Sequence, residues 1–172
     1  MKDIIFIAGA PGSDKSTIAK ILRSRLGSPL FEFGWIPEFR NTGEGKISYS
    51  EEASLAFENL TLVTKNYVKH GFKNIIITDL DNEFIQQIPE LFKDYDFMIY
   101  TLRLDEEMIL KERVLDETRS SEYRDWEKAL EINRLLKDRQ PFVNEVFINV
   151  TSQSAEEIAN QIATESGSRP DS

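Results

Sequence analysis

The sequence predicts an α/β domain of three layers, in which a parallel β-sheet lies between two layers of helices. Apolar runs of strand length alternate along the chain with longer segments of helical periodicity, which is typical of such a fold. The first run, residues 4–8, is apolar throughout, as expected of a strand buried on both faces. A glycine-containing turn over residues 9–17 then leads directly into the first helical segment.

The first helix is expected to begin at Lys15, to bury Ile18 and Leu22 on one face, and to stop at Gly27. The later elements follow from the same two periodicities. Further strands are expected at residues 29–33, 74–79, 96–104 and 146–150, and further helices at about 51–70, 82–92, 106–137 and 155–165.

Serine residues mark two of the helix starts. Ser48 or Ser50 is expected to cap the helix that runs to about residue 70, and Glu51 in its first turn favours the helix dipole. Ser154 is expected to cap the last helix, because Glu157 stands three residues later and completes a capping box.

Two helical segments carry interruptions. Pro89 is expected to disturb the helix over residues 82–92, since proline lacks an amide hydrogen and crowds the preceding turn. The long charged segment 106–137 is expected to form two helices that separate near Ser120 and Ser121.

The composition excludes several classes of protein. The 172 residues suit one domain, expected over residues 1–165, with a polar tail at 166–172 that is expected to be disordered. The absence of cysteine rules out disulfides and thiolate metal sites, and a histidine-based site would depend on His70 alone. The net charge of −9 opposes binding to nucleic-acid duplexes, although backbone amides can still hold the phosphates of a nucleotide.

No apolar run reaches the length of a membrane span. The N-terminus passes into the first strand without the features of a signal peptide, so a cytoplasmic protein is expected. Nothing in the sequence indicates the oligomeric state.

The turn after the first strand has the spacing of a phosphate-binding loop, or Walker A motif. Such a loop curls so that successive amide hydrogens converge on one anion, and the helix that follows adds positive potential. Lys15 is expected to reach the terminal phosphates and Ser16 to place its hydroxyl on Mg²⁺. The predicted nucleotide-binding residues are Gly9, Ala10, Pro11, Gly12, Ser13, Asp14, Lys15, Ser16 and Thr17.

Asp14 departs from this motif, which has glycine immediately before the lysine. A side chain at this position crowds the site where the backbone approaches the phosphates. Its carboxylate also brings like charge to an anion: two unit charges ~4 Å apart at an effective dielectric near 20 interact by about 4 kcal/mol, or roughly a thousandfold in affinity. Pairing of Asp14 with Lys15 would weaken ATP binding further.

Two interpretations of Asp14 remain open. The chain is either a variant, natural or engineered, of an active protein with glycine here, or a protein adapted to a carboxylate, for instance by holding Mg²⁺ differently. The first is favoured, and it predicts that Asp14→Gly strengthens Mg-ATP binding.

A second nucleotide motif is predicted at the end of the third strand, where the apolar run Ile75-Ile76-Ile77 leads to Asp79. An acid in this position of a P-loop protein holds Mg²⁺ directly or through water. Asp81 is the alternative, and both acids could instead be solvated or cap the next helix.

These motifs and the order of elements resemble the nucleoside-monophosphate-kinase-like group of P-loop kinases, which includes shikimate, gluconate, chloramphenicol and nucleoside kinases. The resemblance extends over about residues 3–165 but is sharp only at residues 9–17. It implies a five-stranded parallel sheet in the order 2-3-1-4-5, and a helical lid at about residues 106–138. It also places the acceptor near the end of the second strand and the adenine ring beside the loop that contains Thr151.

The resemblance also implies roles for individual residues. Arg113 and Arg119 look like the lid arginines that neutralise the transferring phosphoryl group, although solvated ion pairs are an equal possibility. A carboxylate after the second strand would orient the acceptor hydroxyl, with Glu32 and Glu38 as candidates. The predicted acceptor residues are Trp35, Glu38 and Arg40. The acidic signatures of shikimate and gluconate kinases are not evident.

The sequence thus favours an ATP- and Mg²⁺-dependent phosphotransferase that acts on an unidentified small molecule or nucleotide and is impaired by Asp14. The predicted catalytic residues are Lys15, Asp79, Arg113, Arg119 and Glu32, with Ser16 and Asp79 on the metal. The alternatives are a non-catalytic binding or regulatory module with a kinase fold and, less favoured, a nucleotide hydrolase.

Overall fold

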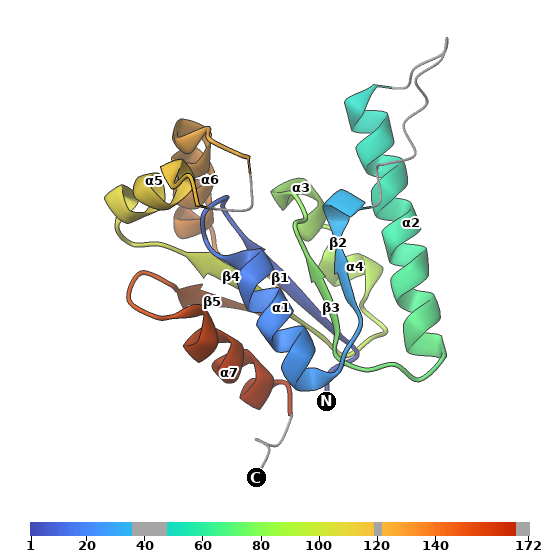
Figure 1. Cartoon of the computed structure of the whole chain (residues 1–172). Coiled ribbons are helices and arrows are strands. Elements are labelled where there is room, and N and C mark those ends of the chain that lie inside the picture. Colours follow the sequence, from blue (N-terminus) through green and yellow to red (C-terminus); the bar gives the residue numbers. More distant parts are fainter. Residues whose placement is uncertain (36–47, 119–121, 168–172) are drawn as a thin grey trace.

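The fold is an α/β structure built on one five-stranded parallel sheet with the strand order β2-β3-β1-β4-β5 (Figure 1). The structure, a computed structural model, describes residues 1–35, 48–118 and 122–167. Every neighbouring pair of strands is parallel, which confirms the predicted fold class and strand order. The strands are β1 (Ile4–Gly9), β2 (Leu30–Glu32), β3 (Ile75–Thr78), β4 (Phe97–Arg103) and β5 (Glu145–Asn149).

Helices cover both faces of this sheet. In Figure 1, α1 and α7 lie over one face, α2 and α4 lie over the other, and α5 and α6 lie side by side near the start of α1. The helices are α1 (Lys15–Leu26), α2 (Tyr49–Lys69), α3 (Asn82–Ile85), α4 (Ile88–Leu91), α5 (Glu107–Leu115), α6 (Trp126–Asp138) and α7 (Ala155–Glu165), with a 3₁₀ helix, η1, at Phe33–Trp35.

Alternate side chains of β1 enter two separate hydrophobic cores, which explains its uninterrupted apolar run. Ile5 and Ile7 pack with apolar residues of α1, α5, α6 and α7. Ile4 and Phe6 pack with apolar residues of α2, α3 and α4 on the opposite face. All four are at most 1% exposed, and full burial of such side chains stabilises the fold by about 1.5–3 kcal/mol each.

The helix starts follow local capping chemistry. Ser48, rather than Ser50, caps α2: the side chain of Ser48 accepts from the Glu51 amide, and the Glu51 carboxylate accepts from the Ser48 amide. Ser154 and Glu157 form the same capping box at the start of α7, as predicted. The hydrogen bonds from Ser48 and Ser154 lower the pKa of Glu51 and Glu157, respectively.

Two expected helices differ from the structure. Residues 82–92 do not form one helix: α3 ends at Ile85 and α4 begins at Ile88, and Gln86 and Gln87 between them keep right-handed dihedral angles without belonging to either helix. Pro89 lies in the first turn of α4. Proline is tolerated there because first-turn amides have no partner within the helix. The segment 106–137 does form two helices, but α5 already ends at Leu115; residues 119–121 lie outside the described part of the chain.

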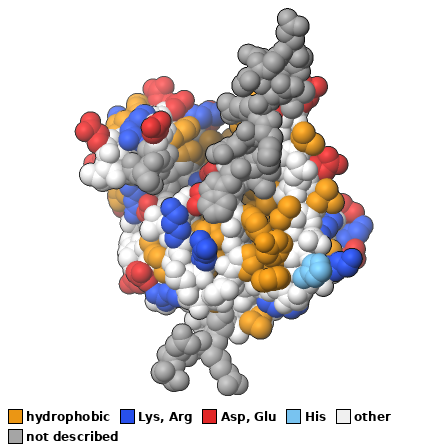
Figure 2. Space-filling model, turned by 45° about the vertical axis from the view of Figure 1, so that its right-hand side comes forward, with side chains coloured by type: hydrophobic (Ala, Val, Ile, Leu, Met, Phe, Trp, Pro, Cys, Tyr) orange, Lys and Arg blue, Asp and Glu red, His pale blue; other side chains and the backbone are white. Residues whose placement is uncertain are grey.

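The surface carries mixed charge and several apolar side chains. Figure 2 shows hydrophobic side chains gathered on one face of the molecule. The exposed large apolar residues in the described part of the chain include Leu62, Val63 and Phe72. Within the described residues, no helix is long and apolar enough to cross a membrane. Ser166 and Gly167 close the C-terminus of α7, and Ser166 is buried; the remainder of the predicted tail, 168–172, is outside the described residues.

Candidate functional site

The loop between β1 and α1 turns sharply at three residues with positive φ: Gly9 at 144°, Gly12 at 89° and Asp14 at 64°. A Cβ atom on Gly9 would lie 2.6 Å from Ser13 Oγ and 2.8 Å from the Leu102 carbonyl oxygen. Only glycine therefore fits at the end of β1, and its absence of a side chain lets the loop fold back tightly.

The loop closes around the carbonyl oxygen of Ala10. The amide and hydroxyl of Ser13 donate to this oxygen at 3.2 and 2.8 Å. Lys15 Nζ also donates to it, at 3.0 Å, so the lysine side chain folds over its own loop. Ser16 and Thr17 follow in the first turn of α1, where Ser16 is half-buried and Thr17 is exposed.

Asp14 adopts the left-handed conformation that glycine usually supplies at this position of the motif. Aspartate is one of the few residues with a side chain that tolerates this region. Its carboxylate Oδ2 lies 3.0 Å from Nη1 of Arg113 on α5. The Asp14 side chain thus points toward α5, and the Arg113 guanidinium lies beside its negative charge.

Helix α5 packs directly against the loop at Gly12. A Cβ atom on Gly12 would lie 2.9 Å from Leu110 Cδ1 and 2.9 Å from Val114 Cγ2. Arg113 of α5 also donates to the carbonyl oxygen of Val150, the residue that follows β5, at 3.3 Å. Arg113 therefore joins the loop, α5 and the end of β5.

The two acids that follow β3 lie with Lys15 around one small cavity of about 130 Å³. Asp79 has a φ of 70°, and Thr78 before it donates to the Ile7 carbonyl oxygen of β1 at 3.2 Å. Asp81 reaches the surface, but partial burial of its carboxyl group raises its pKa. The negative charges of Glu83 and Asp79 raise this pKa further, whereas the positive charge of Lys15 lowers it. The sequence favoured Asp79, but both acids border the cavity.

The donor groups at this cavity suit Mg²⁺ only in the presence of phosphate oxygens. Within the described residues, no group of three or more His, Cys, Asp and Glu side chains could hold a metal. Protein sites for Mg²⁺ in phosphoryl-transfer enzymes commonly supply one or two carboxylates, while substrate phosphates and water complete the octahedron. Asp79 and Asp81, which line the cavity, are carboxylates of this kind.

The end of β2 supplies one further acid. Glu32 is half-buried, and its Oε1 atom is buried without a hydrogen-bond partner among the residues that the structure describes. A Cβ atom on Gly34 would lie 3.4 Å from Asp79 Oδ2, which places η1 close to Asp79. Trp35 ends η1, but its side chain lies outside the described part of the structure, as do Glu38, Arg40 and Arg119, the last predicted for the lid.

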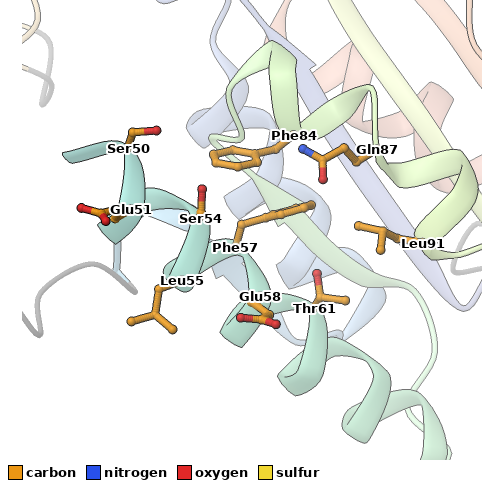
Figure 3. Close-up of a pocket in the computed structure, with 10 residues that line it drawn as sticks. All are labelled: Ser50, Glu51, Ser54, Leu55, Phe57, Glu58, Thr61, Phe84, Gln87 and Leu91. Atoms are coloured by element: carbon orange, nitrogen blue, oxygen red, sulfur yellow. The ribbon is translucent and has the colours of Figure 1, made fainter. Parts of the chain in front are cut away.

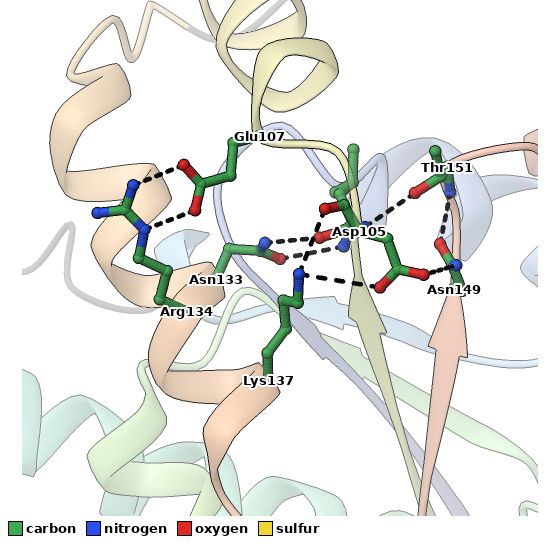
Figure 4. A network of polar contacts seen from close by, with 8 residues as sticks. Asp105, Glu107, Asn133, Arg134, Lys137, Asn149 and Thr151 are labelled. Atoms are coloured by element: carbon green, nitrogen blue, oxygen red, sulfur yellow. Dashed lines mark hydrogen bonds and ion pairs between the residues drawn. The ribbon is translucent and has the colours of Figure 1, made fainter.

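Thr151 belongs to a polar network that links the loops after β4 and β5 (Figure 4). The Asp105 amide donates to Thr151 Oγ1 at 2.9 Å, and the Thr151 amide donates to Asn149 Oδ1 at 2.9 Å. Asn149 Nδ2 donates to the Asp105 carboxylate, and Lys137 Nζ donates to the Asp105 carbonyl oxygen at 3.3 Å. The side chain of Thr151 thus holds the loop in place.

Asn133 was not identified from the sequence, although it organises the same region. Its side chain accepts from the Leu104 amide at 3.1 Å and donates to the Leu104 carbonyl oxygen at 2.8 Å. Asn133 is fully buried in α6, so these two bonds satisfy a polar group that burial would otherwise penalise. An asparagine at an apolar position of a helical pattern was the available signal.

Comparison with known proteins reveals similarity of fold alone. No protein-family model matches the chain, and no curated protein matches it by sequence. Among solved structures, the tunicamycin resistance protein of Deinococcus radiodurans is similar with a TM-score of 0.70 and 19% identity, covering 98% of each chain. A gluconokinase from Sinorhizobium meliloti 1021 has a TM-score of 0.66 and 17% identity, over 94% of this chain and 90% of its own.

A shikimate kinase from Acinetobacter baumannii, solved with shikimate, has a TM-score of 0.57 and 18% identity, over 94% of this chain and 91% of its own. The predicted resemblance to small P-loop kinases is thereby confirmed at the level of fold, over nearly the whole chain.

Proposed function

We propose that this protein is a phosphotransferase that moves the γ-phosphoryl group of Mg-ATP to a small-molecule hydroxyl. The observation that carries the proposal is the arrangement around Lys15: it closes over a curled loop and borders the same cavity as Asp79 and Asp81. Phosphoryl transfer depends mainly on such positioning and charge stabilisation, because the protein makes little covalent contribution.

Each part of this arrangement has a role in the proposal. Amides of the phosphate loop hold the phosphates, except at Pro11, which has no amide hydrogen, and at Ser13, whose amide donates to the Ala10 carbonyl oxygen. Lys15 neutralises charge at the transferred group. Ser16 and Asp79, with Asp81 as the alternative, hold Mg²⁺, which neutralises phosphate charge when it is bound. The Thr151 loop lies beside the base.

The acceptor side of the proposal rests on Glu32. A buried carboxylate oxygen without a partner has a free-energy cost that an incoming hydroxyl donor would relieve. Glu32 would therefore orient the acceptor hydroxyl and take its proton. Trp35, Glu38 and Arg40 are proposed for the remainder of the acceptor site, and Arg119 is proposed as a second lid arginine with Arg113.

Asp14 is proposed to impair this activity by competition within the lid. A nucleotide phosphate and the Asp14 carboxylate are alternative partners for Arg113, since the guanidinium now lies 3.0 Å from Asp14. The ion pair with Arg113 also reduces the repulsion between the Asp14 carboxylate and a bound phosphate. Asp14 is therefore expected to weaken ATP binding by less than the thousandfold expected for an isolated carboxylate. The same pair favours the second candidate, a non-catalytic module whose loop and lid are held together without nucleotide.

Thermal shift with Mg-ATP tests the two candidates on three chains: the parent, Asp14→Gly and Lys15→Met. If the protein is an enzyme disabled by Asp14, Mg-ATP should stabilise Asp14→Gly strongly, the parent weakly and Lys15→Met not at all. A screen of hydroxylated metabolites and nucleosides on Asp14→Gly then measures ADP release that depends on the acceptor. Absence of any stabilisation in Asp14→Gly would sink the kinase proposal and support the module.

A further inference from the structure

A second, larger cavity lies between α2 and the pair α3–α4 (Figure 3). Its volume is about 560 Å³, within the range of ~300–1,000 Å³ that is typical of sites for small organic ligands. We call it the α2 groove. It is lined by Ser50, Glu51, Ser54, Leu55, Phe57, Glu58 and Thr61 of α2, and by Phe84, Gln87 and Leu91 of the facing segment.

Helix α3 separates the α2 groove from the cavity at Lys15. Phe84 and Gln87 line the groove, whereas Asn82 and Ile85 line the smaller cavity.

The floor of the groove is aromatic. The rings of Phe57 and Phe84 stack with centroids 4.5 Å apart and an interplanar angle of 25°. Figure 3 shows the two side chains approaching each other from α2 and α3. Such a floor favours a flat or aliphatic apolar group in the ligand.

The charged groups along the groove are all acidic. Glu51 and Glu58 are the two ionisable residues among those that line it, and neither lysine nor arginine belongs to this described set. Hydrogen bonds from Ser48 lower the pKa of Glu51, so this carboxylate is ionised at neutral pH. Glu58 forms no ion pair with any residue in the described ranges, so its charge is available to a ligand.

We propose that the α2 groove is a second binding site, separate from the acceptor site proposed at Glu32, and that it binds an amphipathic organic cation without acidic groups. The ammonium group lies beside Glu58 and Glu51, and the apolar body rests on Phe57 and Phe84. This binding preference does not depend on the proposed phosphotransferase activity. The groove disfavours anionic ligands such as hydroxy acids and nucleoside monophosphates, to which it offers like charge.

Three small alcohols that share one phenyl ring and one benzylic hydroxyl test this preference. Phenylethanolamine is cationic at neutral pH, phenylethylene glycol is neutral and mandelate is anionic. Calorimetric titration of the full chain without nucleotide is expected to show phenylethanolamine at least about threefold tighter than the glycol and at least about tenfold tighter than mandelate. Mandelate binding as tightly as the amine, or no binding of the amine, overturns the proposal.

Two variants locate the binding. Glu58→Gln is expected to weaken the binding of phenylethanolamine by about threefold and to leave the affinity for the glycol unchanged, because the substitution removes only the charge. Ser54→Leu fills the groove from an exposed helical position that tolerates leucine, and is expected to weaken both ligands by at least about fivefold. Glu127→Gln, on the exposed face of α6, is the matched control and should change neither affinity.

Equal loss of amine and glycol in Glu58→Gln would contradict the charge-based recognition. Failure of the proposed function is distinguishable from failure of this site. If phenylethanolamine binds with the expected charge preference while Asp14→Gly shows no stabilisation by Mg-ATP, the groove stands as a cation site and the kinase proposal falls.

Discussion

Asp14 and Arg113 form an ion pair that joins the phosphate loop to α5, with Oδ2 and Nη1 3.0 Å apart. The two residues are 99 positions apart in the chain, and both side chains remain partly exposed, at 42% and 27%. A pair with this exposure contributes about 0.5 kcal/mol to stability. Its larger effect concerns the site, because it positions a guanidinium beside the loop that the proposed nucleotide occupies.

Asp14→Gly is predicted to strengthen Mg-ATP binding by at least about tenfold, because it removes a carboxylate beside the phosphates and releases Arg113. The backbone at this position already has the conformation that glycine accepts without strain, so the loop should be preserved. Isothermal titration calorimetry with Mg-ATP checks the result.

Asp14→Asn distinguishes the effect of the Asp14 charge from that of its side-chain bulk. Asparagine also tolerates a left-handed conformation but carries no charge. If charge is decisive, both variants bind Mg-ATP equally well; if the side chain obstructs the phosphates, only the glycine variant improves. Identical titration curves for the parent and both variants would refute an inhibitory role of Asp14.

Arg113→Ala, introduced into Asp14→Gly, is predicted to lower kcat by at least about 100-fold while KM for ATP changes less. A lid arginine acts mainly on charge that develops during transfer, and such arginines contribute about 10³–10⁵-fold in related chemistry. Lys111→Ala is the control on the same helix, because Lys111 lies over the Trp126 ring, 3.9 Å from its centroid, and not against the loop. Equal kinetic losses in both variants would argue against a specific role for Arg113.

Gly12→Ala is predicted to destabilise the fold by about 2 kcal/mol, because the new Cβ atom would meet Leu110 and Val114 of α5 at 2.9 Å and φ is positive. Gly27→Ala shares the positive φ but would meet nothing within 4 Å, so its cost should be only about 1 kcal/mol. Urea unfolding of both variants measures the difference. Equal costs would mean that α5 is not packed on the loop.

Arg139→Met is predicted to destabilise the protein by about 3 kcal/mol near neutral pH, because it leaves Glu145 buried without its cation. The Glu145 side chain is fully buried and contacts both Nη atoms of Arg139 at 2.6 and 2.7 Å. Arg134→Met is the control, since it removes an exposed pair with Glu107 and should cost at most about 1 kcal/mol.

The pH dependence of Arg139→Met should be distinctive. Burial alone would raise the pKa of Glu145, but hydrogen bonds from Arg139, Thr101 and Phe142 lower it below its ordinary value of 4.5. In the parent, the stability from this group is therefore present above about pH 4.5 and is lost as pH falls through the folded-state pKa. Without Arg139 burial dominates and the pKa rises, so the parent and the variant should differ more at about pH 7 than at about pH 4 in unfolding experiments.

Much of the fold was predictable because the signals are local. The apolar run of β1, the serine caps of α2 and α7 and the stop at Gly27 depend on neighbouring residues, and all appear in the structure. The helix expected over 82–92, with a disturbance at Pro89, is instead interrupted at Gln86 and Gln87, although Ile85 and Ile88 on either side lie in the same core.

The site was predictable only in part. Fixed spacing identified residues 9–17, since a phosphate loop is a continuous segment. The pairing of Asp14 with Arg113, the shared cavity of Lys15 and Asp81, and the buried Asn133 all involve residues from separate elements. No pattern along the chain encodes such contacts, because they depend on how strands are ordered and helices are packed.

By itself, the amino-acid sequence determined the class of fold, the place of the phosphate loop and the departure at Asp14, because periodicity, capping and a short motif are properties of adjacent residues. The tertiary structure alone decided the partner of the Asp14 carboxylate, the acids that lie beside Lys15 and the acidic, aromatic lining of the α2 groove. Packing of α3 and α5 against the ends of parallel strands brings these distant side chains within a few ångströms, and charge acts over such distances whatever the separation in sequence.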